Sequence, residues 1–301
     1  MMQGPILIAG RNGQVARCLR ELAAARGVTA VALGRRELDL ETHDGVDKVV
    51  AALAPSVIIN AAAYTAVDQA ETQEASAFSI NRDGAAALAA IATRMNIPFV
   101  HLSTDYVFDG SKQGPYDEND IPAPLNVYGA SKLAGEIAVL SACPFATVIR
   151  SAWIYSPYGS NFVRTMQRLS DTRPIVKVVD DQRGNPTSAF DLAAAILQIA
   201  QQSRTVERGA MAGIYHLAGQ GEATWHSFAA AIFDWFGRSG LPVPRLEAIS
   251  TEEYPTPACR PRNSRLDSSK AERVFGIRLP SWRRSLELCL DQLVAEGANR
   301  C

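Results

Sequence analysis

Short apolar runs recur through the first half of the chain and alternate with longer stretches of mixed polarity. The runs are Ile6–Ala9, Val28–Leu33, Val57–Asn60, Phe99–Ser103 and Thr147–Ile149. Each is too short for an amphipathic helix and almost continuously apolar, a pattern typical of strands that are buried on both faces of a sheet. The pattern therefore predicts five buried strands in this half.

The stretches between these runs have helical patterns. Helices are predicted at Gly13–Arg26, His43–Leu53, Glu71–Met95 and Val127–Leu140, and three of them are rich in Ala and Leu, which favour helices. Alternation of strands and helices indicates right-handed crossovers and a parallel sheet. We therefore predict an α/β fold with a doubly wound parallel sheet of the Rossmann type.

The alternation weakens in the second half of the chain. Pro and Gly interrupt the pattern there, for example at Pro157, Gly184, Pro242 and Pro255. We predict a Rossmann domain over residues 1–150, to which later segments return, and a smaller, discontinuous C-terminal lobe formed mainly by residues 151–301.

Composition and charge narrow the class of protein. The chain has 301 residues, of which 47% are hydrophobic and 20% charged, so it can bury enough apolar surface to fold. Lys and Arg number 30 and Asp and Glu 31, which leaves a net charge of −1. Binding to a nucleic-acid backbone needs a basic excess, so we expect no nucleic-acid partner.

The cysteines and the apolar runs indicate a cytoplasmic protein. The five cysteines form no Cys-x-x-Cys pair, and their odd number fits a reducing compartment better than a disulfide framework. The apolar stretch Pro5–Gly10 is too short for the core of a signal peptide. The uncharged run Val49–Val67 is interrupted by Pro55 and Asn60, so we expect no membrane span.

A glycine-containing turn follows the first predicted strand and opens the first predicted helix. Such a turn lets the backbone approach a pyrophosphate at a helix N-terminus, where free N–H groups favour an anion. It predicts an NAD(P)-binding Rossmann domain, although a tight turn without a ligand has the same sequence. The candidate cofactor residues here are Gly10, Asn12, Gly13, Gln14 and Val15.

The end of the second predicted strand bears on the choice of cofactor. An NAD-binding unit usually has an acidic residue there, whereas this chain has Gly34, Arg35 and Arg36. A guanidinium suits the 2′-phosphate of NADPH, so NADPH is favoured and NADH remains possible. Two arginines on a solvated loop are the alternative interpretation.

A hydroxyl, a phenol and an ammonium are expected at one edge of the sheet. Tyr128 and Lys132 are four residues apart and therefore on one face of a helix. Thr104 follows a predicted strand, and ligands of open parallel sheets bind at that carboxyl edge. A half-buried tyrosine and a strand-end cap are the structural alternatives, and we interpret His101 and His216 as core histidines.

Together these motifs resemble the extended short-chain dehydrogenase/reductase family. The resemblance rests on the Gly10 turn, residues 60–64, residues 103–110 and the Tyr128-x-x-x-Lys132 pair. Three further blocks resemble the dTDP-4-dehydrorhamnose reductase family in particular, at residues 125–129, 181–187 and 256–264. The last two lie outside the dinucleotide fold and therefore bear on the substrate.

The resemblance implies NADPH-dependent reduction of the C4 keto group of dTDP-4-dehydro-β-L-rhamnose, the last step of dTDP-rhamnose biosynthesis. Tyr128 would be the general acid, with a pKa lowered by Lys132 and the nicotinamide. Lys132 would also hold the nicotinamide ribose, and Thr104 would hydrogen-bond the C4 oxygen.

The resemblance also assigns binding residues. The cofactor would contact Asp39, Leu40, Ala62, Ala63 and Tyr64. Asp105 and Trp153 would contact the dTDP-4-keto-6-deoxy sugar, and Arg260 would bind its diphosphate, because a planar guanidinium can bind two oxygens at once.

Three other functions share part of these motifs. A 4,6-dehydratase of this kind usually has Glu after the Thr-Asp pair, where this chain has Tyr106, which argues against that activity. A reductase of another NDP-4-keto-6-deoxyhexose would keep every motif. A non-catalytic NADP-binding regulatory subunit is the third alternative, and the intact Thr104, Tyr128 and Lys132 argue against it.

Assembly is where the chain departs from part of the family it resembles. Some relatives form dimers bridged by a divalent cation between glutamates, and the matching positions here are Cys18 and Phe190. Neither supplies the carboxylate oxygens that Mg²⁺ prefers. We therefore predict no metal site, and a monomer or a metal-free homodimer.

Overall fold

A six-stranded parallel sheet forms the centre of the protein. The computed structural model describes residues 4–298. The sheet has the strand order β10-β5-β4-β3-β1-β2. Its strands are β1 (Ile6–Ala9), β2 (Ala30–Leu33), β3 (Val57–Asn60), β4 (Phe99–Thr104), β5 (Thr147–Ser151) and β10 (Gly213–His216). The doubly wound α/β fold is confirmed, because the order reverses at β1 and all the neighbouring strands are parallel.

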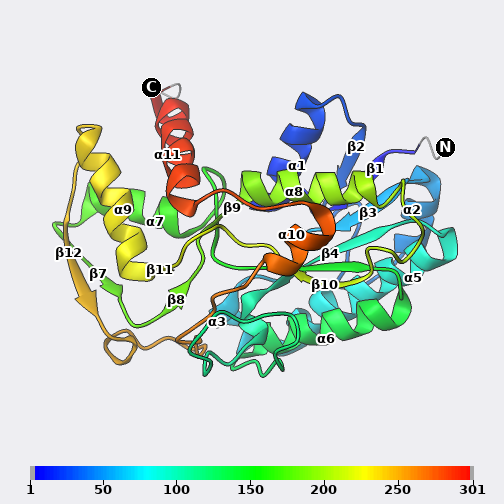
Figure 1. Cartoon of the computed structure of the whole chain (residues 1–301), viewed down its shortest axis with the longest axis horizontal. Helices are drawn as coiled ribbons and strands as arrows, with labels where there is room; N and C mark the ends of the chain where they lie inside the picture. Colours follow the sequence, from blue (N-terminus) through cyan, green and yellow to red (C-terminus); the bar gives the residue numbers. More distant parts are fainter. Residues whose placement is uncertain (1–3, 299–301) are drawn as a thin grey trace.

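Helices cover both faces of this sheet (Figure 1). Successive side chains of a strand point to opposite faces, so Ile6 and Ile8 pack with one set of helices and Leu7 and Ala9 with the other. The first set is α1 (Gln14–Ala25) and α8 (Ala189–Gln202), which also pack on each other. The second set is α2 (Val46–Leu53), α5 (Ala85–Met95) and α6 (Val127–Ala142).

Two expectations about the elements were wrong in part, and one strand was missed. All four residues of β2 are half-buried rather than buried, because β2 is the edge strand. The helix expected at Glu71–Met95 is broken into α4 (Glu74–Phe78), a π-helical turn η1 (Ser79–Gly84) and α5, with a short α3 (Val67–Ala70) before it. The strand β10 was not expected, and it brings a segment of the second half of the chain into the sheet.

A second core lies beside the sheet and is built around aromatic side chains of α9 (Trp225–Arg238). This lobe also contains α7 (Phe162–Thr172) and α11 (Trp282–Ala298), and β7 (Ile175–Val179) pairs with β12 (Arg245–Ile249) in parallel. The remaining elements are short. They are η2 (Asp105–Val107), β6 (Ile154–Tyr155), β8 (Arg183–Gly184), β9 (Thr187–Ser188), β11 (Ala223–Thr224), η3 (Thr251–Glu253) and α10 (Ser269–Phe275).

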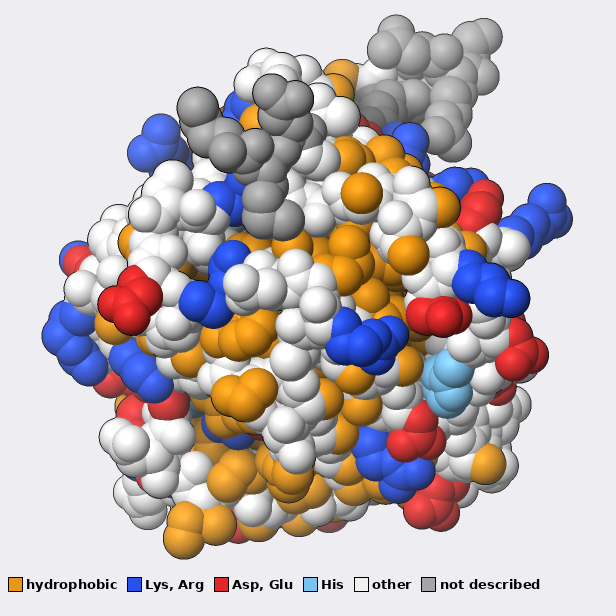
Figure 2. Space-filling model, turned by 90° about the vertical axis from the view of Figure 1, so that its right-hand side faces the viewer, with side chains coloured by type: hydrophobic (Ala, Val, Ile, Leu, Met, Phe, Trp, Pro, Cys, Tyr) orange, Lys and Arg blue, Asp and Glu red, His pale blue; other side chains and the backbone are white. Residues whose placement is uncertain are grey.

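The charged side chains and the cysteines of the described residues follow no special pattern. Figure 2 shows positive and negative side chains interspersed on one face, with neither sign gathered into a broad patch. In residues 4–298 Cys18, Cys143, Cys259 and Cys289 form no disulfide, and Cys301 lies outside the described residues. No helix of that described part is long and apolar enough to cross a membrane.

Candidate active site

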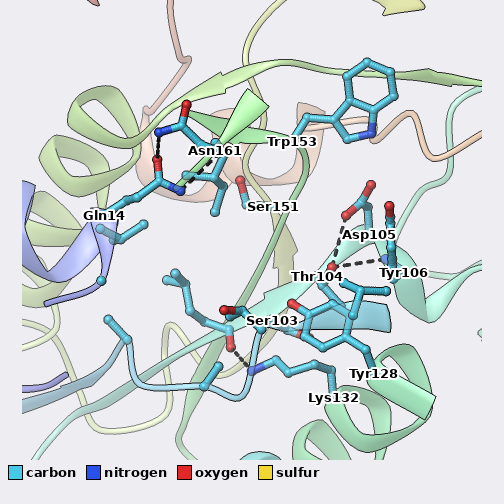
Figure 3. Close-up of a pocket in the computed structure, with 18 of the residues that line it drawn as sticks. Gln14, Ser103, Thr104, Asp105, Tyr106, Tyr128, Lys132, Ser151, Trp153 and Asn161 are labelled. Carbon is cyan, nitrogen blue, oxygen red and sulfur yellow. Dashed lines mark hydrogen bonds between the residues drawn. The ribbon is translucent and has the colours of Figure 1, made fainter. Parts of the chain in front are cut away.

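A cavity of about 540 Å³ lies at the carboxyl edge of the sheet, facing the second lobe (Figure 3). Its walls come from the turn before α1, from the ends of β4 and β5, and from the N-terminal half of α6. The second lobe contributes Asn161 and Trp225. Of the residues predicted from sequence, the cavity brings together Asn12, Gly13, Gln14, Val15, Ala63, Thr104, Asp105, Tyr128, Lys132 and Trp153.

The turn between β1 and α1 has the geometry of an anion site. Gly10 has φ +105°, a left-handed conformation that favours glycine, and a Cβ there would lie 3.2 Å from the carbonyl carbon of Ala61. Gly13 is the N-cap of α1, without a side-chain cap, and the space beside it is open. The first N–H groups of α1 are therefore free of side-chain caps, and this fits a cofactor pyrophosphate.

A second, smaller cavity of about 90 Å³ lies on the other side of this turn. It is lined by Gly10, Arg35, Asp39, Leu40, Ala62 and Ala63 among others. Ala63 lines both cavities, so the two hollows flank the same stretch of backbone. Tyr64 lines neither cavity, and its hydroxyl donates to Gln73 at 2.9 Å. An elongated dinucleotide, with its adenosine end beside Arg35, fits this arrangement.

Thr104, Tyr128 and Lys132 meet on one side of the large cavity (Figure 3). Tyr128 lies in the first turn of α6, whose N-cap Asn126 accepts a hydrogen bond from the Gly129 N–H at 2.7 Å. Gly129 packs directly on the Tyr106 carbonyl oxygen, where a Cβ would overlap that oxygen. A capped helix start and one close backbone contact therefore place the phenol beside the end of β4.

Burial shifts the pKa values of Tyr128 and Lys132 in opposite directions. It raises the pKa of Tyr128 to about 12, which the hydroxyl of Thr104 opposes. It lowers the pKa of Lys132 to about 8, which the carboxylate of Glu136 opposes. Our expectation of a lowered phenol pKa was therefore wrong for the protein without its cofactor, and Tyr128 holds its proton at neutral pH.

Two buried oxygens of the cavity wall lack hydrogen-bond partners. Among residues 4–298 they are Oδ2 of Asp105 and Oγ of Ser151, and both side chains are almost fully buried. Burial also raises the pKa of Asp105 to about 7. Unpartnered polar atoms are costly inside a protein, so the cavity is built for a polar ligand.

Two stacked indoles close the far side of the cavity. The rings of Trp153 and Trp225 are parallel within 5°, with centroids 3.6 Å apart. Trp153 has φ +44°, a strained conformation for a residue with a side chain. Gly184 lies against its ring, where a Cβ would overlap the indole. The contacts with Trp225 and Gly184 fix the position of Trp153.

Arg260 does not line the cavity, in contrast to the other residues expected at the sugar nucleotide. Its guanidinium makes two bonds to the Asp68 carboxylate, of 3.1 and 2.9 Å. The side chain of Tyr106, which lines the cavity, also hydrogen-bonds Arg260. Arg260, which we expected to bind the diphosphate, is therefore held next to the cavity by its ion pair with Asp68.

Sequence reasoning missed a polar cluster that joins α1 to the second lobe. Gln14 Oε1 accepts a hydrogen bond from Ser156 Oγ at 2.8 Å. It also accepts one from Asn161 Nδ2 at 2.9 Å (Figure 3). Asn161 is also the N-cap of α7. An Asn directly before an apolar helical pattern is a recognisable N-cap, but its contact with Gln14 joins segments far apart in sequence.

The chain matches a known family over almost its whole length. The family model described as the RmlD substrate binding domain matches residues 2–295. A dTDP-4-dehydrorhamnose reductase from Sinorhizobium fredii is 46% identical over 292 residues, which cover 97% of this chain and 98% of the relative. The chain belongs to the dTDP-4-dehydrorhamnose reductase family.

Solved structures of the family agree with this assignment. The dTDP-4-dehydrorhamnose reductase of Clostridium acetobutylicum is 37% identical and superposes with a TM-score of 0.89 over 96% of this chain and 99% of that one. The enzyme from Bacillus anthracis, solved in complex with NADP, is 36% identical, with a TM-score of 0.88 over 97% of this chain and 100% of that one. Family membership makes the chain an NAD(P)-dependent oxidoreductase.

Proposed function

We propose that this chain reduces the C4 keto group of dTDP-4-dehydro-β-L-rhamnose to dTDP-β-L-rhamnose, the last step of dTDP-rhamnose biosynthesis. The observation that carries the proposal is the full-length family match on a chain whose Thr104, Tyr128 and Lys132 share one cavity. That cavity continues to the uncapped start of α1. A hydride donor and a polar sugar can therefore meet at the end of β4.

Tyr128 supplies the proton in this proposal. Bound NADPH provides the hydride. The phenol, protonated at neutral pH because burial raises its pKa, donates to the C4 oxygen as negative charge develops there. Thr104, at the end of β4, offers a second hydrogen bond to the same oxygen. Lys132, one helical turn after Tyr128, holds the nicotinamide ribose and faces the phenol from the same helix.

The sugar nucleotide is proposed to bind between the sheet edge and the second lobe. The unpartnered carboxylate oxygen of Asp105 would accept a bond from a sugar hydroxyl, and Trp153 would pack on the sugar nucleotide. Arg260 would exchange the Asp68 carboxylate for diphosphate oxygens, since both present paired oxygens to the guanidinium. Residues 1–150 would supply most of the cofactor site and residues 151–301 most of the substrate site.

Further proposals concern the cofactor, the assembly and the compartment. Arg35 lines the small cavity, which supports NADPH over NADH. Cys18 is fully buried and Phe190 packs on Tyr158, which supports a monomer or a metal-free homodimer. The absence of a disulfide among the cysteines of residues 4–298 supports a cytoplasmic location.

The test is an assay of NADPH oxidation with the dTDP-4-keto sugar, with the product identified by NMR. We expect dTDP-β-L-rhamnose as the product. Turnover only with a different 4-keto-6-deoxyhexose would replace the proposed substrate, and NADPH binding without turnover of any such sugar would indicate a regulatory subunit.

A further inference from the structure

Lys132 is one end of a buried polar row that crosses from α6 to the middle of the sheet. Its Nζ lies 2.6 Å from the Leu102 carbonyl oxygen and 3.5 Å from Nε2 of His101. On the other side of the imidazole, Nδ1 lies 3.1 Å from Nδ2 of Asn60. The three polar side chains of this row, Asn60, His101 and Lys132, are at most 2% exposed. They must therefore satisfy one another, because little water reaches them.

The orientation of Asn60 determines where the imidazole carries its proton. The Ala62 N–H donates to Oδ1 of Asn60 at 3.2 Å, so the amide branch that faces His101 is the NH₂ group. An NH₂ group can only donate, and Nδ1 of His101 must therefore accept. Burial and the nearby Lys132 keep the pKa of His101 well below its usual value, so the ring is neutral. Its single proton is then on Nε2, and it points toward Lys132.

We propose that Asn60 and His101 are positioning residues for Lys132: they aim an N–H donor at Nζ and thereby favour its amine form over the ammonium. The amine form of Lys132 can accept a hydrogen bond from the Nε2–H of His101 and still donate one to the Leu102 carbonyl oxygen. The ammonium form has no lone pair and cannot accept from Nε2–H. The proposal rests on the function proposed above, in which Lys132 serves the nicotinamide ribose and Tyr128.

The other titratable groups around Lys132 do not favour its amine form. On α6 itself, Glu136 lies one turn away and raises the pKa of Lys132, but its carboxylate is bound by Arg150 of β5, at 2.8 and 2.6 Å. Tyr128, also on α6, is neutral. Asp105, just beyond β4, has a pKa raised to about 7 and so gains negative charge through neutral pH, but the pKa of Lys132 responds to burial and to Glu136 rather than to Asp105. Asn60 of β3 carries no charge.

The first experiment measures the tautomer directly and needs no activity. The full chain, labelled with ¹⁵N in its histidine rings and free of cofactor, is studied by NMR between about pH 6 and 9. We expect His101 to stay neutral, with the proton on Nε2 throughout. A proton on Nδ1, or titration of the ring within that range, would overturn the proposal. The His101 signals are assigned from their absence in His101→Gln or, if that variant does not fold, by removing the other histidines one at a time.

The second experiment is a pH profile of kcat/KM for His101→Gln. The glutamine can turn its carbonyl oxygen toward Nζ and so favours the ammonium, and we expect the alkaline limb to move upward by about one pH unit, a tenfold change in proton affinity. His216→Gln is the matched control, because Nε2 of His216 lies at the same distance, 3.5 Å, from another basic side chain, at Nη1 of Arg150, away from Lys132. It should leave the limb in place.

The two experiments separate a positioning role from a structural one. If His101 only fills the core, His101→Gln lowers kcat/KM equally at every pH and the limb stays where it is, which contradicts the proposal. If the chain proves to have another substrate, the kinetic profile is measured with that substrate, and the NMR result stands by itself. Failure of the proposed function and failure of this inference are therefore distinguishable.

Discussion

At the scale of single residues, the hydroxyl of Tyr128 carries the proposed chemistry. Tyr128→Phe removes the proton donor but little volume, so we expect kcat to fall about 10²-fold or more, with NADPH affinity nearly unchanged. Steady-state kinetics and a fluorescence titration of NADPH measure the two quantities. Tyr254→Phe is the control, since Tyr254 is 58% exposed and lies outside the cavity. Activity of Tyr128→Phe within a few-fold of the wild type would refute the mechanism.

Arg35 and Arg36 are neighbours in sequence, but only Arg35 lines the small cavity. Arg35→Ala should weaken NADPH binding about tenfold or more and NADH binding far less, because only NADPH carries a 2′-phosphate. Arg36→Ala should change both affinities little. Dissociation constants for the two cofactors, measured by calorimetry, decide the matter, and equal losses for NADPH and NADH would rule out a 2′-phosphate contact.

The carboxyl group of Asp105 makes stability depend on pH. Burial raises its pKa from 3.8 to about 7, so the folded chain keeps a proton that the unfolded chain loses, and stability falls as pH rises between these values. Asp105→Asn has no titrating group at this position, so its stability does not fall with pH for this reason. We expect the variant to have a higher Tm than the wild type at pH 8 and the same difference to disappear near pH 4.

The same substitution should weaken substrate binding, because an amide replaces the oxygen proposed to accept from the sugar. Thermal unfolding at both pH values and the KM for the dTDP-4-keto sugar test the two halves of this prediction. A Tm difference that is equal at pH 4 and pH 8 would show that titration of Asp105 is not its cause.

At the scale of elements, the position of α6 decides where the proposed catalytic group lies. The π-helical turn η1 is bound to α6 through Asn81, whose Nδ2 donates to Ser131 Oγ at 2.9 Å. The other fixed point is Gly129, which touches the Tyr106 carbonyl oxygen. Small residues at such contacts let backbones approach closely, and any larger side chain must push them apart.

Gly129→Ala should therefore displace the start of α6 and with it Tyr128. We expect kcat to fall about tenfold or more, since small misplacements of reacting groups are costly, and Tm to fall as well. Gly114→Ala is the matched control, because a Cβ at Gly114 meets nothing within 4 Å and its backbone is not left-handed. If both variants have wild-type kcat, the close contact does not position the phenol.

At the scale of the whole molecule, we expect the chain to assemble without a metal bridge. Burial raises the pKa of the Cys18 thiol to about 12, so this position offers no thiolate to a metal. Among the described residues no group of three or more His, Cys, Asp or Glu side chains could hold an ion. We expect mass and turnover to be the same with and without EDTA.

Light scattering and NADPH-linked turnover, each with and without EDTA, test this prediction. Loss of dimer mass together with activity on chelation, restored by Mg²⁺, would show that a metal bridge exists despite Cys18 and Phe190.

Much of the fold could be predicted because it depends on neighbours in sequence. Strands β1 and β3 have the predicted bounds, and the turn at Gly10 opens α1 as expected. Strand β10 was missed because its four residues carry little pattern of their own and become a strand only by pairing with β5. The π turn was missed as well, and its Asn81 bonds to Tyr64 and Ser131, which belong to segments that no local pattern brings together.

The sequence by itself determined the Rossmann sheet, the glycine turn and the spacing of Tyr128 and Lys132, since periodicity and helix geometry are local properties. Only the tertiary structure decided the rest. It paired Arg260 with Asp68, raised rather than lowered the pKa of Tyr128, and turned His101 from an ordinary core residue into a neighbour of Lys132. Burial and partners come from segments that meet only on folding, and no local pattern encodes them.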